Sequence, residues 1–404
     1  MRWEYSRDMK CSRYKEHYDV HIEEILFLFG VYTKQFYILP SGSFQLGDLF
    51  LIVSFIYCII FRLKIKIPFY REDRPFYLYV LMIAIINFVY FSMYKSGFIK
   101  GTLYYIYNLL VLLAFTYYTH SERAEEFVKL LGIVLKLIIV SQMVILLTGI
   151  GKWYGGVRYL GTFNDPNQYG FFILSTSLLV YLICLKLEKS YWLWLLLGFW
   201  LVFPSGSAGM IAGIISFSII WVISNISDLR RKTVIRVLLL ICILIIILIG
   251  FTQGFIQLPE SVTNSFTYRR VFRRISKFIN ASSSDIIVSD RGWRRLLEYP
   301  QYLFWGAGEG GFFRFNTVLE IHSSVLGPLF YYGFIPFSLI CIWVYNKVHG
   351  IGLKYLCAYV CLFAESFFLV NTRQPFFWMI LAFAGYIKMT NVRNDESKAI
   401  PTTY

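Results

Sequence analysis

The amino-acid sequence predicts an all-α integral membrane protein whose helices, about 12 in number, form one transmembrane bundle. Hydrophobic residues make up 57% of the 404 residues and charged residues only 16%, whereas soluble domains carry about 25% charged residues. Apolar runs of about 20 residues follow one another along most of the chain, as the hydrocarbon core of a bilayer requires. The basic residues between these runs are concentrated in alternate connectors, which is typical of membrane proteins.

The predicted spans follow from these apolar runs. They lie at 22–39, 47–62, 76–95, 101–119, 126–149, 168–185, 191–204, 208–224, 234–251, 324–345, 352–370 and 374–389. The first run is the weakest because three charged residues interrupt it. We therefore divide the chain into N-terminal helices (1–251), one large outer loop (252–323), and C-terminal helices with a tail (324–404).

Basic residues in the short connectors set the expected orientation. An N-terminus in the cytoplasm also places there the basic clusters at 62–74, 186–189, 230–236 and 388–398. Both termini are then cytoplasmic, and the loop 252–323 lies outside. Its segment 268–279 places apolar residues on one face and four arginines beside them, which predicts an amphipathic helix at the membrane surface. The net charge of +15 fits this bias, so no nucleic-acid partner is expected.

Three segments on the predicted outer side carry most of the polar chemistry. The first, VRYLGTFNDPNQYG at 157–170, combines Arg158 with a turn that contains Asn164 and Asn167. Asn164 or Asp165 is expected to cap the helix that follows, because a short polar side chain there accepts hydrogen bonds from free backbone N–H groups. A cap does not explain Arg158, a cation at the membrane surface beside a rigid turn.

The second segment, SDRGWRRLLEYPQYLFWGAGEGGF at 289–312, is rich in arginine and glycine. Arg291, Arg294 and Arg295 have the spacing i, i+3 and i+4, so one helical turn would present them together. Planar guanidinium groups bind diphosphate oxygens in pairs. The glycines lack the Gly-Lys-Ser/Thr sequence of a nucleotide loop and are interpreted as a tight turn.

The third segment, EIHSSVLGPLFYYGF at 320–334, contains the only one of the five histidines on the predicted outer side. His322 precedes a helix and follows Glu320 by two residues. An imidazole can act as a general base near neutral pH. No Asp-x-Asp sequence occurs in the outer loops and the cysteines lie mostly in apolar runs, so neither a metal nor a disulfide is expected.

Together the three segments resemble the O-antigen polymerase and ligase superfamily of bacterial surface-polysaccharide assembly (Wzy/WaaL type). The resemblance depends on Arg158 with GTFNDPN, on DRGW followed by WGAGEGG, and on IHS followed by YYGF. It covers the middle of the chain up to the tenth predicted span. Members often carry an arginine where this chain has PSGSAG (204–209), and His-Asn where it has His322-Ser323.

The resemblance implies a GT-C-like glycosyltransferase of the bacterial inner membrane, with its active site facing the periplasm or exterior and no cofactor. Its donor and acceptor would be oligosaccharides linked to polyprenyl diphosphate, and its further partners membrane lipid, a chain-length regulator and a flippase. His322 would be the base, while Arg291 and Arg158 would stabilise the diphosphate. The expected substrate-binding residues are Arg294, Arg295, Asn164, Asn167, Glu320 and Arg314.

Three functions remain open at this point. A polymerase of O-antigen or capsule repeat units is preferred, and a ligase that transfers the glycan to lipid A core shares the same motifs. The third is a flippase for lipid-linked oligosaccharides. A transporter places ionisable residues within the bundle, where Glu365 and Asp48 are the strongest candidates.

Overall fold

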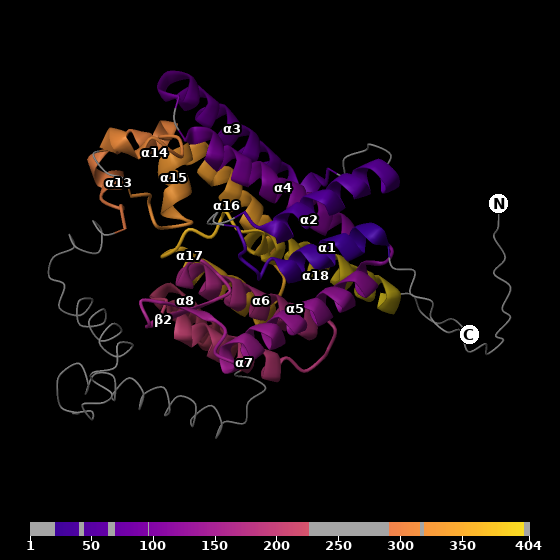
Figure 1. Cartoon of the computed structure of the whole chain (residues 1–404). Helices are drawn as coiled ribbons and strands as arrows, with labels where there is room; N and C mark the ends of the chain where they lie inside the picture. The colour runs from indigo at the N-terminus through magenta and orange to yellow at the C-terminus, as the bar shows by residue number, and fades with distance from the viewer. Residues whose placement is uncertain are drawn as a thin grey trace, which may run out of the picture.

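The computed structural model describes residues 21–39, 44–63, 69–95, 97–225, 291–315 and 319–399, with side chains as far as residue 391. The described chain is mainly helical (Figure 1). The predicted ninth span at 234–251 and the predicted amphipathic helix at 268–279 lie outside the described residues.

The described residues up to Lys186 form six helices and one hairpin. The helices are α1 (Ile22–Thr33), α2 (Leu46–Tyr57), α3 (Arg74–Tyr94), α4 (Phe98–His120), α5 (Ala124–Leu147) and α6 (Pro166–Lys186). A π-helical turn, Cys58–Arg62, extends α2, and a 3-10 turn, Arg71–Asp73, precedes α3. Strands β1 (Lys152–Tyr154) and β2 (Arg158–Gly161) pair antiparallel between α5 and α6.

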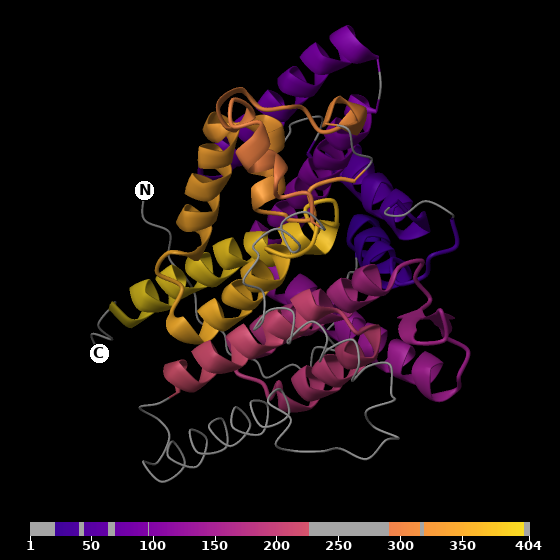
Figure 2. The ribbon, with the colours of Figure 1, turned by 90° about the vertical axis from the view of Figure 1, so that its left-hand side faces the viewer.

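The described residues after Lys186 form five longer helices and several short ones. The apolar helices are α7 (Trp192–Val202), α8 (Ala208–Ser224), α16 (Phe334–Val348), α17 (Leu353–Ser366) and α18 (Pro375–Ala399). The short helices are α13 (Arg295–Glu298), α14 (Tyr302–Trp305) and α15 (Leu326–Tyr332), with 3-10 turns at Phe203–Ser205 and Phe312–Phe315. Figure 2 shows the short orange helices gathered at one end of the bundle, beside the far end of α3.

Helices form at the predicted apolar runs throughout the described residues, with two differences. The first run, 22–39, is helical only as far as Thr33. The tenth run, 324–345, is divided into α15 and α16 at Gly333, whose φ of +80° favours glycine. A Cβ at this position would collide with the backbone oxygen of Phe304. Gly333 therefore allows α14 to pack closely against the junction of the two helices.

Among the described residues, four helices are long and apolar enough to cross a membrane: α3 with its preceding turn, α4, α5 and α6. Helices α7, α8 and α16 are apolar but shorter. The outer face of α3 exposes large apolar side chains, among them Leu78, Leu81, Ile85 and Phe88, which is the surface that lipid covers. The described residues thus form an all-α membrane protein.

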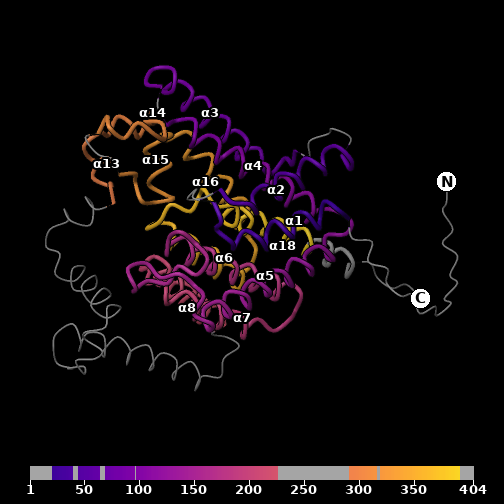
Figure 3. Tube along the Cα trace, in the orientation of Figure 1, coloured from indigo at the N-terminus to yellow at the C-terminus, as the bar shows by residue number. Residues whose placement is uncertain are grey.

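Helix α6 lies at the centre of the bundle. In its most apolar stretch, 89% of the residues are buried. The helix packs against α5, α7, α8, α17 and α18. The trace in Figure 3 shows α6 among these neighbours, with α8 close to α17. The loops at the end of α17 and before α6 and α8 are therefore held close together, and they carry the polar residues described next.

Candidate active site

Two of the segments singled out in the sequence, 289–312 and 320–334, meet the connector 367–374, which was not predicted to belong to the site. The backbone N–H of His322 donates to the carbonyl oxygen of Arg291, with a distance of 3.0 Å. Two residues later, the backbone N–H of Ser324 donates to the carbonyl oxygens of Ser366 and Leu369, at 2.8 Å each. The connector between α17 and α18, residues 367–374, thus forms one wall of the site that holds His322.

Backbone contacts on both sides of His322 fix its position. The N–H of Ile321 donates to the hydroxyl of Tyr331 at 2.7 Å. The hydroxyl of Ser323 accepts from the N–H groups of Val325 and Leu326 at the start of α15. Ser323 thus satisfies backbone donors that α15 leaves free at its first turn.

The imidazole of His322 is half-buried, and no described residue makes a hydrogen bond with it. Burial lowers the pKa of His322 below its ordinary value, and Glu320 acts in the opposite direction. Three guanidinium groups lower the pKa further, those of Arg291, Arg373 and Arg295. The ring is therefore neutral at pH 7 and can accept a proton, as a general base must.

Arg291 lies against the connector. Its guanidinium donates to the carbonyl oxygen of Phe368 and lies 5.4 Å from the centroid of the Phe368 ring. Trp293 packs against the same connector, with its ring nearly perpendicular to that of Phe367. These contacts orient Arg291 beside His322 and keep its guanidinium at the site.

Arg373 is a site residue that sequence reasoning missed. Its guanidinium donates to Oε1 of Glu309 at 2.5 and 3.1 Å and to Oε2 of Glu320 at 2.6 Å. Burial alone would lower the pKa of Arg373, but the two carboxylates outweigh burial and raise the pKa well above its ordinary value. Glu309 also accepts from the hydroxyl of Tyr332. This network joins the glycine-rich turn, the His322 segment and the connector.

The expected single turn bearing three arginines is not formed. Residues 291–294 form a turn with Gly292 at a φ of +71°, and α13 begins only at Arg295. Arg294 points to the surface, where it pairs with Glu298 at 2.7 Å. Arg295 is buried, donates to the carbonyl oxygen of Leu319 at 2.7 Å, and lies over the rings of Phe312 and Phe315. Of the three, Arg291 and Arg295 are the ones close enough to influence His322.

Arg314 closes the glycine-rich turn. Its guanidinium donates to carbonyl oxygens of Ala307, Gly310 and Gly311 and lies over the rings of Tyr90 and Tyr94. The four glycines at 306, 308, 310 and 311 have positive φ angles, and the chain bends at Glu309 and Gly310. Arg314 stabilises the turn that presents Glu309.

Arg158 belongs to a second cluster next to the connector. Only 7% exposed, it donates from Nε to the carbonyl oxygen of Ser205 at 2.7 Å and from a terminal nitrogen to Oδ1 of Asn167 at 2.8 Å. Asp165 caps α6 by accepting from the N–H groups of Asn167 and Gln168, which confirms one of the two predicted caps. Asn164 instead donates to the carbonyl oxygen of Leu39.

Helix α8 connects this cluster to the connector. It starts just after Ser205 and packs along α17. At Gly209, a Cβ would lie 3.1 Å from the side chain of Leu369, whose carbonyl oxygen accepts from Ser324. The structure therefore brings Arg158 to the side of the connector that packs against α8. Arg291 contacts the connector at Phe368, and the His322 segment contacts it through Ser324.

The two carboxylates considered for transport both have partners. Glu365 accepts from the hydroxyl of Ser366 at 2.9 Å and from the amide of Asn371 at 2.5 Å. Asp48 pairs with the buried ammonium group of Lys34 at 2.5 Å. Both therefore stabilise the packing of neighbouring segments.

An apolar cavity of 390 Å³ begins beside the His322 segment. It is lined at this end by Ser324, Val325 and Pro328, and it extends along α16 past Phe337 as far as Tyr345. Residues of α3, α17 and α18 complete its walls. The site thus has a charged part and an adjoining apolar part within the membrane bundle.

Within the described ranges, no group of three or more histidine, cysteine or acidic side chains could hold a metal ion. No protein-family model matches the sequence, and no curated protein matches it either. Its function therefore has to be inferred from the residues of the site.

Proposed function

We propose that the protein is a glycosyltransferase that joins oligosaccharide repeat units linked to polyprenyl diphosphate, as a polymerase of O-antigen or capsule. The enzyme would be a 12-span, GT-C-like protein of the bacterial inner membrane, acting on its outer face. One observation carries the proposal: the half-buried imidazole of His322 lies near three guanidinium groups, and an apolar cavity begins at Ser324, two residues later. His322 would supply the base, the guanidinium groups would bind the diphosphate, and the adjoining cavity would hold the lipid.

The chemistry of the transfer matches these side chains. His322 takes the proton of the acceptor hydroxyl, while the oxygen of that hydroxyl forms a bond to the anomeric carbon of the donor sugar. The bond from that carbon to the lipid diphosphate breaks, and the diphosphate leaves with the bonding electrons. Arg291 stabilises the charge that develops there, and a preorganised donor of this kind is worth about 10²–10³ in rate. General base catalysis contributes about 10²–10⁴.

The rest of the network would keep these groups in place. Arg373 pairs with both Glu309 and Glu320 and offsets part of their negative charge, so these carboxylates repel the diphosphate less. Arg158 is the second cation proposed for the diphosphate, held by Asn167 and by the backbone of Ser205. The apolar cavity provides room for the first part of the prenyl chain.

The alternatives differ in the acceptor or in the absence of chemistry. A ligase would use the same base and cations but would take lipid A core as acceptor. A flippase needs no base at one membrane face, and it needs ionisable groups along a path through the bundle. A transfer reaction, by polymerase or ligase, explains His322 with its arginines, and the partners of Glu365 and Asp48 weaken the support for transport.

One experiment separates the three functions. The purified protein receives only polyprenyl-diphosphate-linked repeat units, with EDTA present and without nucleotide or lipid A core. A polymerase produces a ladder of longer lipid-linked glycans, and the ladder is lost in His322→Ala. A ligase leaves the repeats unchanged until lipid A core is added, and a flippase makes no covalent product in either case. Absence of the ladder with wild-type protein contradicts the proposal.

A further inference from the structure

A second cavity, of 720 Å³, lies at the opposite end of the bundle from His322. It is formed by the turn before α3, the last residue of α4, and residues 385–389 of α18. The 21 residues of α3 separate it from Tyr94, which contacts Arg314 near the candidate active site. At 1.5 Å per residue, this is about 32 Å, the thickness of a hydrocarbon core. The cavity therefore lies at the other membrane face.

The charges around this cavity leave an excess of cations. The buried ammonium group of Lys347 pairs with Glu72 at 2.6 Å and with Asp73 at 2.8 Å. Asp73 also accepts from the indole N–H of Trp343 at 2.7 Å. Arg71 and Lys388 line the same cavity. Among the described residues, three cations and two carboxylates thus line the cavity or adjoin it, and the two carboxylates already share Lys347.

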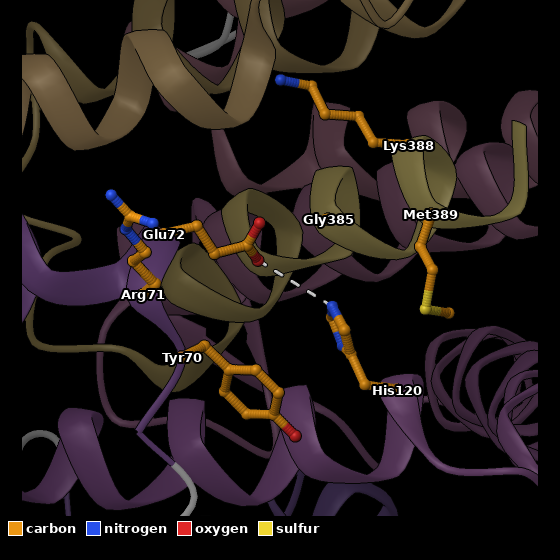
Figure 4. A pocket seen from close by; sticks show the side chains of 7 residues that line it. All are labelled: Tyr70, Arg71, Glu72, His120, Gly385, Lys388 and Met389. Atoms are coloured by element: carbon orange, nitrogen blue, oxygen red, sulfur yellow. Dashed lines mark ion pairs between the residues drawn. The ribbon is translucent and has the colours of Figure 1, made fainter. Parts of the chain in front are cut away.

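His120 presents a hydrogen-bond acceptor to the cavity. Its Nδ1 lies 2.8 Å from the carbonyl oxygen of Thr116, and because a carbonyl only accepts, Nδ1 carries the proton. The neutral ring then has an unprotonated Nε2. That nitrogen lies 3.8 Å from Oε1 of Glu72, too far for a hydrogen bond. Figure 4 shows the two groups facing each other, with Met389 beside His120 and the extended side chain of Lys388 on the side of α18.

Gly385 creates the space between these groups. A Cβ at this position would lie 3.3 Å from Oε1 of Glu72, 3.4 Å from Nζ of Lys347 and 3.5 Å from the ring of His120. The cavity is far larger than a phosphate ion requires, since volumes of about 300–1,000 Å³ hold drug-sized molecules. Apolar side chains adjoin it: Met389 and Tyr70 line the cavity, and Phe69 beside them is 64% exposed.

We propose that this cavity binds the headgroup of an anionic phospholipid with free hydroxyl groups, of the phosphatidylglycerol class. Arg71 and Lys388 hold the phosphate, because a basic recess between helices at a membrane face attracts anionic headgroups. Nε2 of His120 and the carboxylate of Glu72 accept hydrogen bonds from the glycerol hydroxyls. The apolar side chains beside the cavity contact the first methylene groups of the lipid.

Binding of lipids to the purified full chain in neutral detergent tests this proposal, by native mass spectrometry or by titration. Phosphatidylglycerol should bind more tightly than phosphatidylcholine, and more weakly as salt is raised. Arg71→Ala and Lys388→Ala should each weaken its binding about fivefold, whereas Lys388→Arg should retain it. Lys189→Ala is the matched control, an exposed lysine at the same end of the bundle, and should bind like the wild type.

His120→Ala distinguishes headgroup recognition from charge attraction. It should reduce binding of phosphatidylglycerol but leave the binding of phosphatidic acid, which lacks the glycerol hydroxyls, unchanged. Equal affinity for phosphatidylcholine, or wild-type affinity in the Arg71→Ala/Lys388→Ala variant, overturns the proposal. So does equally tight binding of soluble glycerol phosphate, which would identify a site for a free anion. A melting curve in phosphatidylcholine shows that each variant is folded.

Discussion

Replacing Arg373 by glutamine removes the cation that joins two carboxylates beside His322. The side chain of Glu309 is only 9% exposed, so its charge would be left almost without solvent. Removal of one partner from a buried ion pair costs about 3–5 kcal/mol of unfolding free energy. Glu320 is 26% exposed and Glu309 keeps the hydroxyl of Tyr332, so we expect a smaller loss of about 2–4 kcal/mol.

A double-mutant cycle measures this effect by denaturant titration in mixed micelles. Glu309→Gln removes the stranded charge, so the Arg373→Gln/Glu309→Gln protein should recover stability, with a coupling energy of about 1–3 kcal/mol. Arg294→Gln is the matched control because Arg294 is 60% exposed in its pair with Glu298, and exposed pairs contribute about 0–1 kcal/mol. If Arg373→Gln loses no more stability than Arg294→Gln, or if the double variant shows simple additivity, the network does not stabilise the site.

The remaining predictions concern activity in the repeat-unit assay. Arg291→Ala and Arg158→Ala should each abolish the ladder while the amount of protein in the membrane stays unchanged. Lysine at either position should restore little activity, because an ammonium lacks the planar pair of donors. A normal ladder in Arg291→Ala would exclude that residue from the mechanism. His322→Ala should lower kcat more than it changes the KM for donor, and the opposite split would make His322 a binding residue. Because burial lowers the pKa of His322, activity should hold at pH 7 and fall only as the pH drops through a value below 6.5. Glu320 raises that pKa, so Glu320→Gln should move this acid limb to lower pH, and an upward shift would contradict the assignment.

The helix positions were predictable because insertion into lipid depends on local hydrophobicity. The runs gave helices even where, as in α1, charged residues interrupt them, since those charges find partners such as Arg62 for Glu23. The break at Gly333 was not predicted, because the close approach of Phe304 that requires glycine comes from α14, almost 30 positions earlier in the chain.

The site was only partly predictable for a related reason. His322 and Arg291 stood out as polar residues in expected outer loops, and the structure brings their segments together. Arg373 lies in a very short connector between two apolar runs, and its importance depends on Glu309 and Glu320, more than 50 residues away. The available signal was a single arginine in a stretch of apolar sequence. The spacing of Arg294 and Arg295 misled because Gly292 replaces the first helical turn with a tight turn.

The burial of α6 has a consequence for biosynthesis. The helix is inserted early, yet α17 and α18, which cover part of its surface, are made almost 170 residues later. Until then, side chains such as Phe172, whose ring packs against Phe376, lack their contacts with α17 and α18 and are exposed there to lipid or a chaperone. Native contacts across so long a stretch of chain delay the completion of the fold. A chain that stops before residue 353 should therefore be inserted in the membrane but remain sensitive to proteolysis around α6. A separately expressed C-terminal fragment should restore protection from proteolysis.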